Sequence, residues 1–205
     1  MYKQLLMQFL DENRPAGKFL TAPALMHYQL KKLVVQDADE QRREFDILKE
    51  KIMPERLAEA APGIAKIKEI ASGSDLVQTM LRKQDPLNND AIVDKAMEFE
   101  EDVVPEVVRR FKNNMTMDFI EMAVLVMVKS KFNMADEIMG YFDDMRSPYA
   151  QSLALVVLGF KADENAIPWL ISKYHQMKKR YPRDSHYLGA YYGLEEIAGR
   201  FIYDI

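Results

Sequence analysis

The chain has 205 residues, of which 48% are hydrophobic and 29% are charged, and its net charge at pH 7 is −4. This balance is ordinary for a soluble globular protein and lacks the strongly basic character of a dedicated nucleic-acid-binding domain. The chain contains no cysteine, which excludes disulfides, thiolate catalysis and the usual structural zinc sites.

The first residues, MYKQLLMQFLDENR, contain an apolar run that Gln8 interrupts and that is too short for the core of a signal peptide. Nowhere do 18 apolar residues follow one another, so we expect no membrane-spanning helix and a cytoplasmic location.

The N-terminal region, residues 1–88, is predicted to be helical. The expected helices are 1–12, 22–35, 37–53 (with Asp37 as N-cap and Pro54 as the stop), 62–71 and 74–83. No convincing repeat is found here. Three interpretations of this region remain open: a degenerate continuation of the repeats in residues 89–205, a helical cap, or a separate helical domain. The boundary is expected in QDPLNND, residues 84–90.

Residues 89–205 repeat one apolar pattern. The segments VVPEVVRRF, MADEIMGYF and AIPWLISKY each place apolar residues at i, i+3, i+4 and i+7, starting at Val104, Ala135 and Ile167. These starts differ by 31 and 32 residues. Pro105 and Pro168 take the same place, which we expect to be the opening of the helix.

A second helix is predicted after each of these segments. The three second helices share a small residue (Ala123, Ala154 and Ala190) that would let helices approach closely, while Gln151 interrupts one apolar row. Two helices per unit with a period near 31 residues predict stacked helical hairpins that share a continuous core.

SLALVVLGFKADENAIPWLISKY resembles a HEAT-type repeat, with an Ala- and Leu-rich helix, a short acidic turn and AIPWL opening the next helix. The resemblance covers roughly residues 89–205. It implies an all-α fold, a right-handed α-α superhelix or HEAT-like helical-hairpin solenoid, whose second helices line the concave side. Most proteins of this class are scaffolds, adaptors or assembly factors.

Catalytic chemistry finds little support in the sequence. His27, His175 and His186 form no HExxH motif, and the adjacent acids (Glu100-Glu101-Asp102, Asp143-Asp144 and Glu195-Glu196) are typical of solvated helix faces or turns. No nucleophile elbow, P-loop or dinucleotide fingerprint occurs. We expect no catalytic site, metal site or cofactor.

A non-catalytic protein-binding role on the concave face is the preferred interpretation. If the apolar stripes face the core, the outer face carries Arg110, Tyr141 and Lys173 at one repeat position and Trp169 at another, with Arg109 beside them. Exposed aromatic and arginine side chains are common binding anchors. In the opposing interpretation, Trp169 only covers the neighbouring loop.

Two alternatives remain. A nucleic-acid patch would use the cations and the interleaved tyrosine of KKRYPR (Lys178, Lys179, Arg180, Tyr181 and Arg183), as in HEAT-like DNA glycosylases, but acidic residues outnumber basic ones by 13 to 7 in residues 89–147 and disfavour it. A self-assembling subunit would use the tyrosine-rich C-terminal end. The rings of that end fold back on the core in the competing interpretation.

Overall fold

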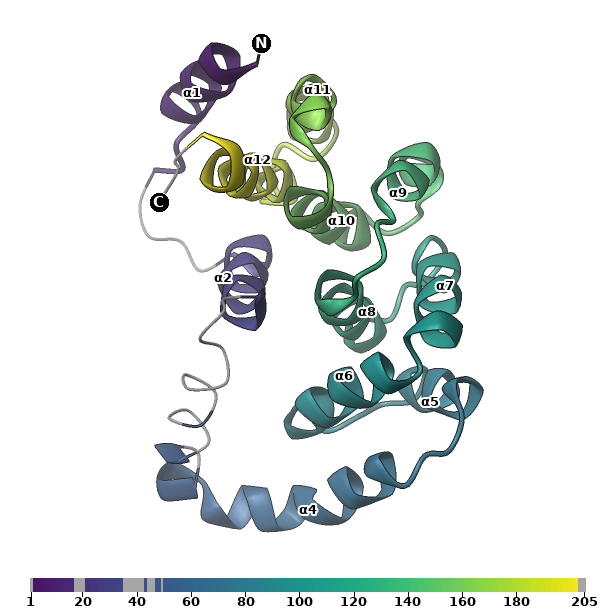
Figure 1. The fold of residues 1–205 in the computed structure, drawn as a ribbon. Coiled ribbons are helices and arrows are strands. Elements are labelled where there is room, and N and C mark those ends of the chain that lie inside the picture. The colour runs from purple at the N-terminus through teal and green to yellow at the C-terminus, as the bar shows by residue number, and fades with distance from the viewer. Residues whose placement is uncertain (1, 17–20, 35–42, 44–46, 49, 203–205) are drawn as a thin grey trace. The chain divides into compact units, whose positions relative to one another are not determined.

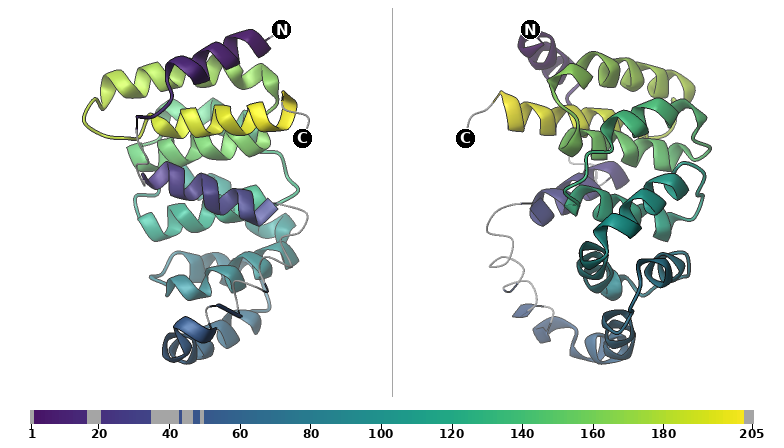
Figure 2. Two further views of the ribbon diagram at one scale, coloured as in Figure 1. Left: turned by 90° about the vertical axis from the view of Figure 1, so that its left-hand side faces the viewer. Right: turned by 45° about the vertical axis from the view of Figure 1, so that its right-hand side comes forward.

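The computed structural model describes residues 2–16, 21–34, 43, 47, 48 and 50–202, and its regular structure over these residues is entirely helical (Figures 1 and 2). None of the helices in this part combines the length and hydropathy that a membrane span requires. The chain divides into two compact units, here called unit 1 (residues 1–29, 112–115 and 133–205) and unit 2 (residues 30–111 and 116–132). The boundary expected near residues 84–90 lies within unit 2.

Unit 2 is built from short helices that pack on one another in chain order. Its elements are α4 (Pro54–Lys68), α5 (Gly73–Met80), η1 (Pro86–Asn88), α6 (Asn89–Glu98), α7 (Glu100–Phe111) and α8 (Met117–Lys129). The predicted stripe of α7 is buried from Val104 to Phe111, and α7 packs against α5 and α8. Residues 122–128 of α8 are buried without a break, as expected for a helix that is apolar on every side.

Unit 1 combines the C-terminal hairpins with the N-terminal helices. It contains α1 (Lys3–Glu12), the start of α2 (Ala22–Val34), α9 (Ala135–Tyr141), η2 (Phe142–Asp144), α10 (Pro148–Lys161), η3 (Glu164–Ala166), α11 (Ile167–Arg180) and α12 (Leu188–Phe201). The hydroxyl of Ser147 caps α10 by accepting a hydrogen bond from the Ala150 N–H. Every residue of α10 from Ala150 to Gly159 is buried, so this helix is the centre of the unit.

Two sequence predictions need correction. Pro105 does not open its helix, because α7 begins at Glu100, where three consecutive acids favour a helix N-terminus. Pro54 opens α4, which runs through Pro62 to Lys68 instead of beginning at residue 62. The described helical residues before it end at Ile52, so the predicted stop at Pro54 is confirmed. Most of the helix expected at 37–53, with its Asp37 cap, lies outside the described residues.

Gln151, which interrupts the apolar row, is buried, but its amide is hydrogen-bonded and so avoids the cost of an unpaired polar group. Its Nε2 donates a hydrogen bond to the backbone carbonyl of Phe142 at 3.1 Å. The side chain therefore ties the start of α10 to η2, and a residue that weakens the repeat pattern becomes part of the connection between two elements.

Glycines set the distance between α10 and α12, which lie side by side (Figure 1). A Cβ atom on Gly189 would lie 2.0 Å from the Ser152 carbonyl oxygen, and one on Gly193 would lie 2.2 Å from the Leu155 carbonyl oxygen. On the facing helix, a Cβ on Gly159 would meet the Gly193 backbone at 2.6 Å. Ala123, Ala154 and Ala190, which were expected to allow close approach of helices, are buried. The backbone contact between α10 and α12, however, is made at glycines.

The tyrosine-rich end is packed by the chain itself. Tyr174 is only 2% exposed and lies between Phe9 of α1, at 4.9 Å between ring centroids, and Tyr187, at 5.2 Å. Both contacts are edge-to-face. α1 also packs against α12, so the first helix of the chain covers part of its C-terminal end (Figure 2). Tyr203 lies outside the described residues.

Replacing Gly189 with alanine should destabilise the protein by about 3 kcal/mol, because the new methyl group must push apart two helix backbones. Gly199→Ala is the matched control on the same helix: its Cβ meets nothing within 4 Å. That variant should gain about 0.5–1 kcal/mol from helix propensity. Urea unfolding of both variants measures the difference, and equal stabilities would contradict the glycine contact.

Candidate functional site

Lys173 is the best-anchored of the predicted contact residues, and the prediction that it is exposed is wrong. It is 8% exposed, and its Nζ donates to Asp143 Oδ1 at 2.6 Å and Oδ2 at 2.7 Å and to Gln176 Oε1 at 3.0 Å. All three ammonium protons are thereby used. The ion pair joins α11 to η2 within unit 1.

Trp169 lies over this ion pair. The Lys173 Nζ is 5.1 Å from the indole centroid, and Phe142 meets the indole edge-to-face at 5.2 Å. Trp169 is only partly buried, so the ring covers the neighbouring element and still presents surface to solvent. The two interpretations of Trp169, as a cover and as an anchor, are therefore compatible.

Tyr141, which directly precedes η2, has a similar setting. Its ring lies 5.8 Å from Lys112 Nζ, and that ammonium pairs with Asp144 at 3.0 Å. Burial, and to a smaller extent the carboxylate of Glu137, raises the pKa of the Tyr141 phenol, which remains a hydrogen-bond donor at neutral pH.

The junction surface, as we call Gly140, Tyr141, Asp143, Asp144 and Trp169, combines these features. Two partly exposed aromatic rings flank η2, and each is beside a lysine–aspartate pair. The side chains of Asp143 and Asp144 are 64% and 69% exposed, so their outer oxygens face solvent. Gly140 is exposed and has open space around its Cβ position.

Arg109 and Arg110 belong to unit 2, where both pair with Glu106 on the same helix. Arg109 is exposed, and its two hydrogen bonds to the carboxylate measure 2.7 Å. The pKa of Glu106 is lowered to about 2, and the hydrogen bonds from Arg109 are the largest cause. The hydrogen bond from Arg110 lowers the pKa further. Both guanidinium groups are thus engaged within α7.

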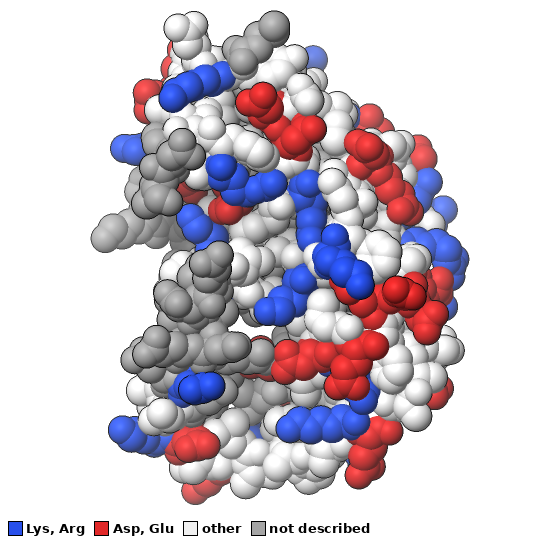
Figure 3. Space-filling model, viewed as in Figure 1, with Lys and Arg blue, Asp and Glu red and all other residues white. Residues whose placement is uncertain are grey.

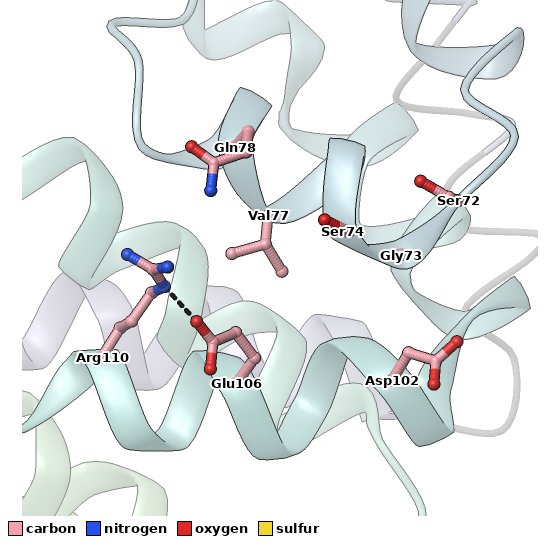
Figure 4. Close-up of a pocket in the computed structure, with 8 residues that line it drawn as sticks. All are labelled: Ser72, Gly73, Ser74, Val77, Gln78, Asp102, Glu106 and Arg110. Carbon is pink, nitrogen blue, oxygen red and sulfur yellow. Dashed lines mark hydrogen bonds and ion pairs between the residues drawn. The ribbon is translucent and has the colours of Figure 1, made fainter.

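Arg110 also lines an open cleft of about 400 Å³ between α5 and α7 (Figure 4). Ser72, Gly73 and Ser74 form its wall at the start of α5, and Asp102 and Glu106 form the facing wall. Gly73 packs directly on α7, since its Cβ position is 2.9 Å from that of Asp102. The cleft mixes both charge signs, and its one cation, Arg110, is paired with Glu106, so it specifies no ligand.

The KKRYPR segment is exposed at the end of α11. Lys178, Lys179 and Arg180 form the last helical turn, and Tyr181 and Arg183 follow. On the face drawn in Figure 3, basic and acidic side chains are interspersed. The segment is therefore a local concentration of positive charge rather than part of a broad basic surface.

The three histidines make separate contacts with other side chains. His27 is buried and its Nε2 donates to Glu196 Oε2 at 2.9 Å, linking α2 to α12. His175 contacts Phe9 and Tyr174, and His186 contacts Tyr181. Among the described residues, no three His, Asp or Glu side chains are placed to hold a metal ion.

The partners of the anchor residues were not predicted from the sequence. Asp143 and Asp144 have the pattern of a solvated helix face or turn, and Lys112 lies outside the motifs. A usable signal was present, because the paired charges are one repeat apart: 30 residues for Asp143–Lys173 and 32 for Lys112–Asp144. Opposite charges at the repeat spacing therefore predict ion pairs between consecutive hairpins.

Comparisons with protein-family models, with curated proteins and with solved structures returned no significant match.

A double-mutant cycle should distinguish the buried ion pair from the exposed one. The cycle of Lys173→Met and Asp143→Asn should give a coupling of about 1–2 kcal/mol in the free energy of unfolding, because Lys173 loses charged hydrogen bonds in a buried position. The matched cycle, Lys112→Met with Asp144→Asn, should give at most about 0.5 kcal/mol because both groups are more exposed. Chemical unfolding provides the values, and a reversed order would contradict the assigned roles.

Glu106 should make stability depend on pH between about 4.5 and 2. Its folded pKa is lowered, so its contribution is present above pH 4.5 and is lost as the pH falls toward 2. Glu106→Gln should melt about 2–4 °C below the wild type at pH 6, and the difference should shrink at low pH. Glu69→Gln, at an exposed position, is the control. A difference that stays constant from pH 6 to pH 2 would contradict this role.

Proposed function

We propose that the protein is a non-catalytic binding module of the HEAT-like type that holds a partner protein on the junction surface. The observation that carries this proposal is the pair of partly exposed aromatic rings, Tyr141 and Trp169, each held in place by an ion pair.

The solenoid part of the proposal is supported by the spacing of interactions within each unit. Glu100–Lys131 and Arg56–Asp85 in unit 2 are 31 and 29 residues apart, close to the repeat period, as are the two pairs of unit 1. In a stacked array each hairpin contacts its neighbours, so equivalent positions recur at this separation. Successive hairpins are thereby joined by charges on their edges as well as by their apolar faces.

The binding part rests on preorganisation. Aromatic side chains dominate protein interfaces when they enter a partner's pocket with little loss of conformational freedom. The Trp169 ring is held by Phe142 and Lys173, so little further ordering is needed on binding. Around the rings, Asp143 and Asp144 provide a polar rim that favours a partner with basic residues.

The test uses a position that can be blocked without harm to the fold. Gly140→Arg places a long side chain beside Tyr141, where the Cβ meets nothing within 4 Å. Gly199→Arg makes the same change at an equally open glycine of α12. Tagged wild type, Gly140→Arg and Gly199→Arg are used to capture proteins from the native host's lysate, after confirming that all three melt alike.

We expect a protein that is retained by the wild type and by Gly199→Arg and that Gly140→Arg loses by at least tenfold. Its binding to the three purified variants is then measured directly. If Gly140→Arg retains every protein that the wild type retains, the junction surface is not the binding site.

A further inference from the structure

The KKRYPR segment carries an arrangement that the protein-binding proposal does not use. Its four cations, Lys178, Lys179, Arg180 and Arg183, are all exposed. Within the described part of the chain, none of them has a carboxylate within ion-pairing distance. This contrasts with Lys173, Lys112, Arg109 and Arg110, each of which has an acidic partner.

Tyrosine rings hold two of these cations in place. Lys178 Nζ lies 5.3 Å from the Tyr174 centroid and 5.4 Å from the Tyr187 centroid, and the Arg180 guanidinium lies 5.3 Å from the Tyr181 centroid. A ring face satisfies part of a cation's charge but accepts none of its hydrogen bonds in the way a carboxylate does. The N–H groups therefore remain available for an oxygen ligand.

Compensation of the helix dipole explains the segment only in part. Cations in the last turn of a helix are favourable, and α4 shows the same feature with Lys66 and Lys68. That helix end has no aromatic rings among its basic residues. Arg183 also lies beyond the last turn of α11, where the dipole acts weakly.

We propose that this segment, together with Tyr187, binds single-stranded nucleic acid. Guanidinium groups match phosphate oxygens in a two-point geometry, and lysine ammonium groups supply further charge along a phosphate backbone. Tyr181 and Tyr187 are partly exposed, and aromatic rings among cations offer stacking surfaces for unpaired bases. An acidic polypeptide would use the cations but would have no use for the rings.

The segment lies at the far end of α11 from the junction surface. Trp169 and Arg180 are separated by eleven positions of one helix, or about 16 Å along its axis. The two surfaces can therefore be altered independently, and the failure of one proposal leaves the other unaffected.

The test measures binding of the full chain to a fluorescent 20-nucleotide uridine strand by anisotropy, at salt concentrations from 50 to 200 mM. If four phosphates are neutralised, the slope of log K against log salt should be about −2.8. Lys179→Glu combined with Arg183→Glu should reduce affinity at least tenfold and reduce the slope to about −1.4. Neither cation takes part in a ring contact that the structure shows, so the fold is preserved.

The control is Lys66→Glu combined with Lys68→Glu at the end of α4. Both double variants change the net charge from −4 to −8, so long-range electrostatics are matched. The control should keep its affinity within about twofold at 200 mM salt, because it leaves all four cations of the segment in place. Equal losses in the two double variants would overturn the assignment of the site.

Stacking is tested separately with Tyr181→Leu, which should lower affinity about tenfold and leave the salt slope unchanged. A polyglutamate peptide of 20 residues serves as the acidic competitor. If it binds as tightly as the uridine strand and Tyr181→Leu has no effect, the segment is a general acidic-protein site and the proposal fails. Absence of binding to the uridine strand at 50 mM salt would also overturn it.

Discussion

The backbone contact between α10 and α12 is the constraint on which the arrangement of unit 1 depends. With no side chain at Gly159, Gly189 or Gly193, the two helices approach until carbonyl oxygens and Cα atoms touch. At this distance the Ser152 hydroxyl reaches the His186 carbonyl oxygen at 2.7 Å, and Arg200 reaches the carbonyl oxygens of Gly159 and Ala162 at the end of α10. These bonds fix the register of α12. That register in turn aligns Glu196 with His27 of α2.

Ion pairs at the edges of the hairpins complement this apolar and backbone core. Lys173 illustrates how one residue serves several purposes: its charge is neutralised by Asp143, its donors are satisfied, and its ammonium group supports the Trp169 and Phe142 rings. A buried lysine without these partners would be costly, so the carboxylate, the amide and the aromatic rings are needed together. The same arrangement prepares a rigid aromatic surface, which is the physical basis of the proposed protein-binding role.

α11 carries two surfaces of different chemistry because its two ends meet different environments. Near its start it packs on η2, whose aspartates neutralise the lysine of α11 and leave aromatic rings partly exposed. At its end Lys178 and Arg180 lie against tyrosine rings, and among the described residues no carboxylate pairs with the cations, so they stay available to an anionic ligand. Both ends of α11 have aromatic rings beside their cations. They differ in chemistry because the cation near the start is paired with an aspartate, whereas two of the cations at the end contact tyrosine rings instead.

The sequence by itself determined the helical class and most of the buried positions, because apolar spacing reports directly which side of a helix leaves water. The stripe from Val104 to Phe111 and the buried run of α10 from Leu153 to Gly159 follow from that rule. Only the tertiary structure decided that Lys173 is buried, that Gln151 bonds the Phe142 carbonyl, and that α1 covers the tyrosines at the other end of the chain. Each of these depends on contacts between residues far apart in sequence. A polar or aromatic residue can be either exposed or buried. The local sequence around it therefore does not show which distant residue will contact it.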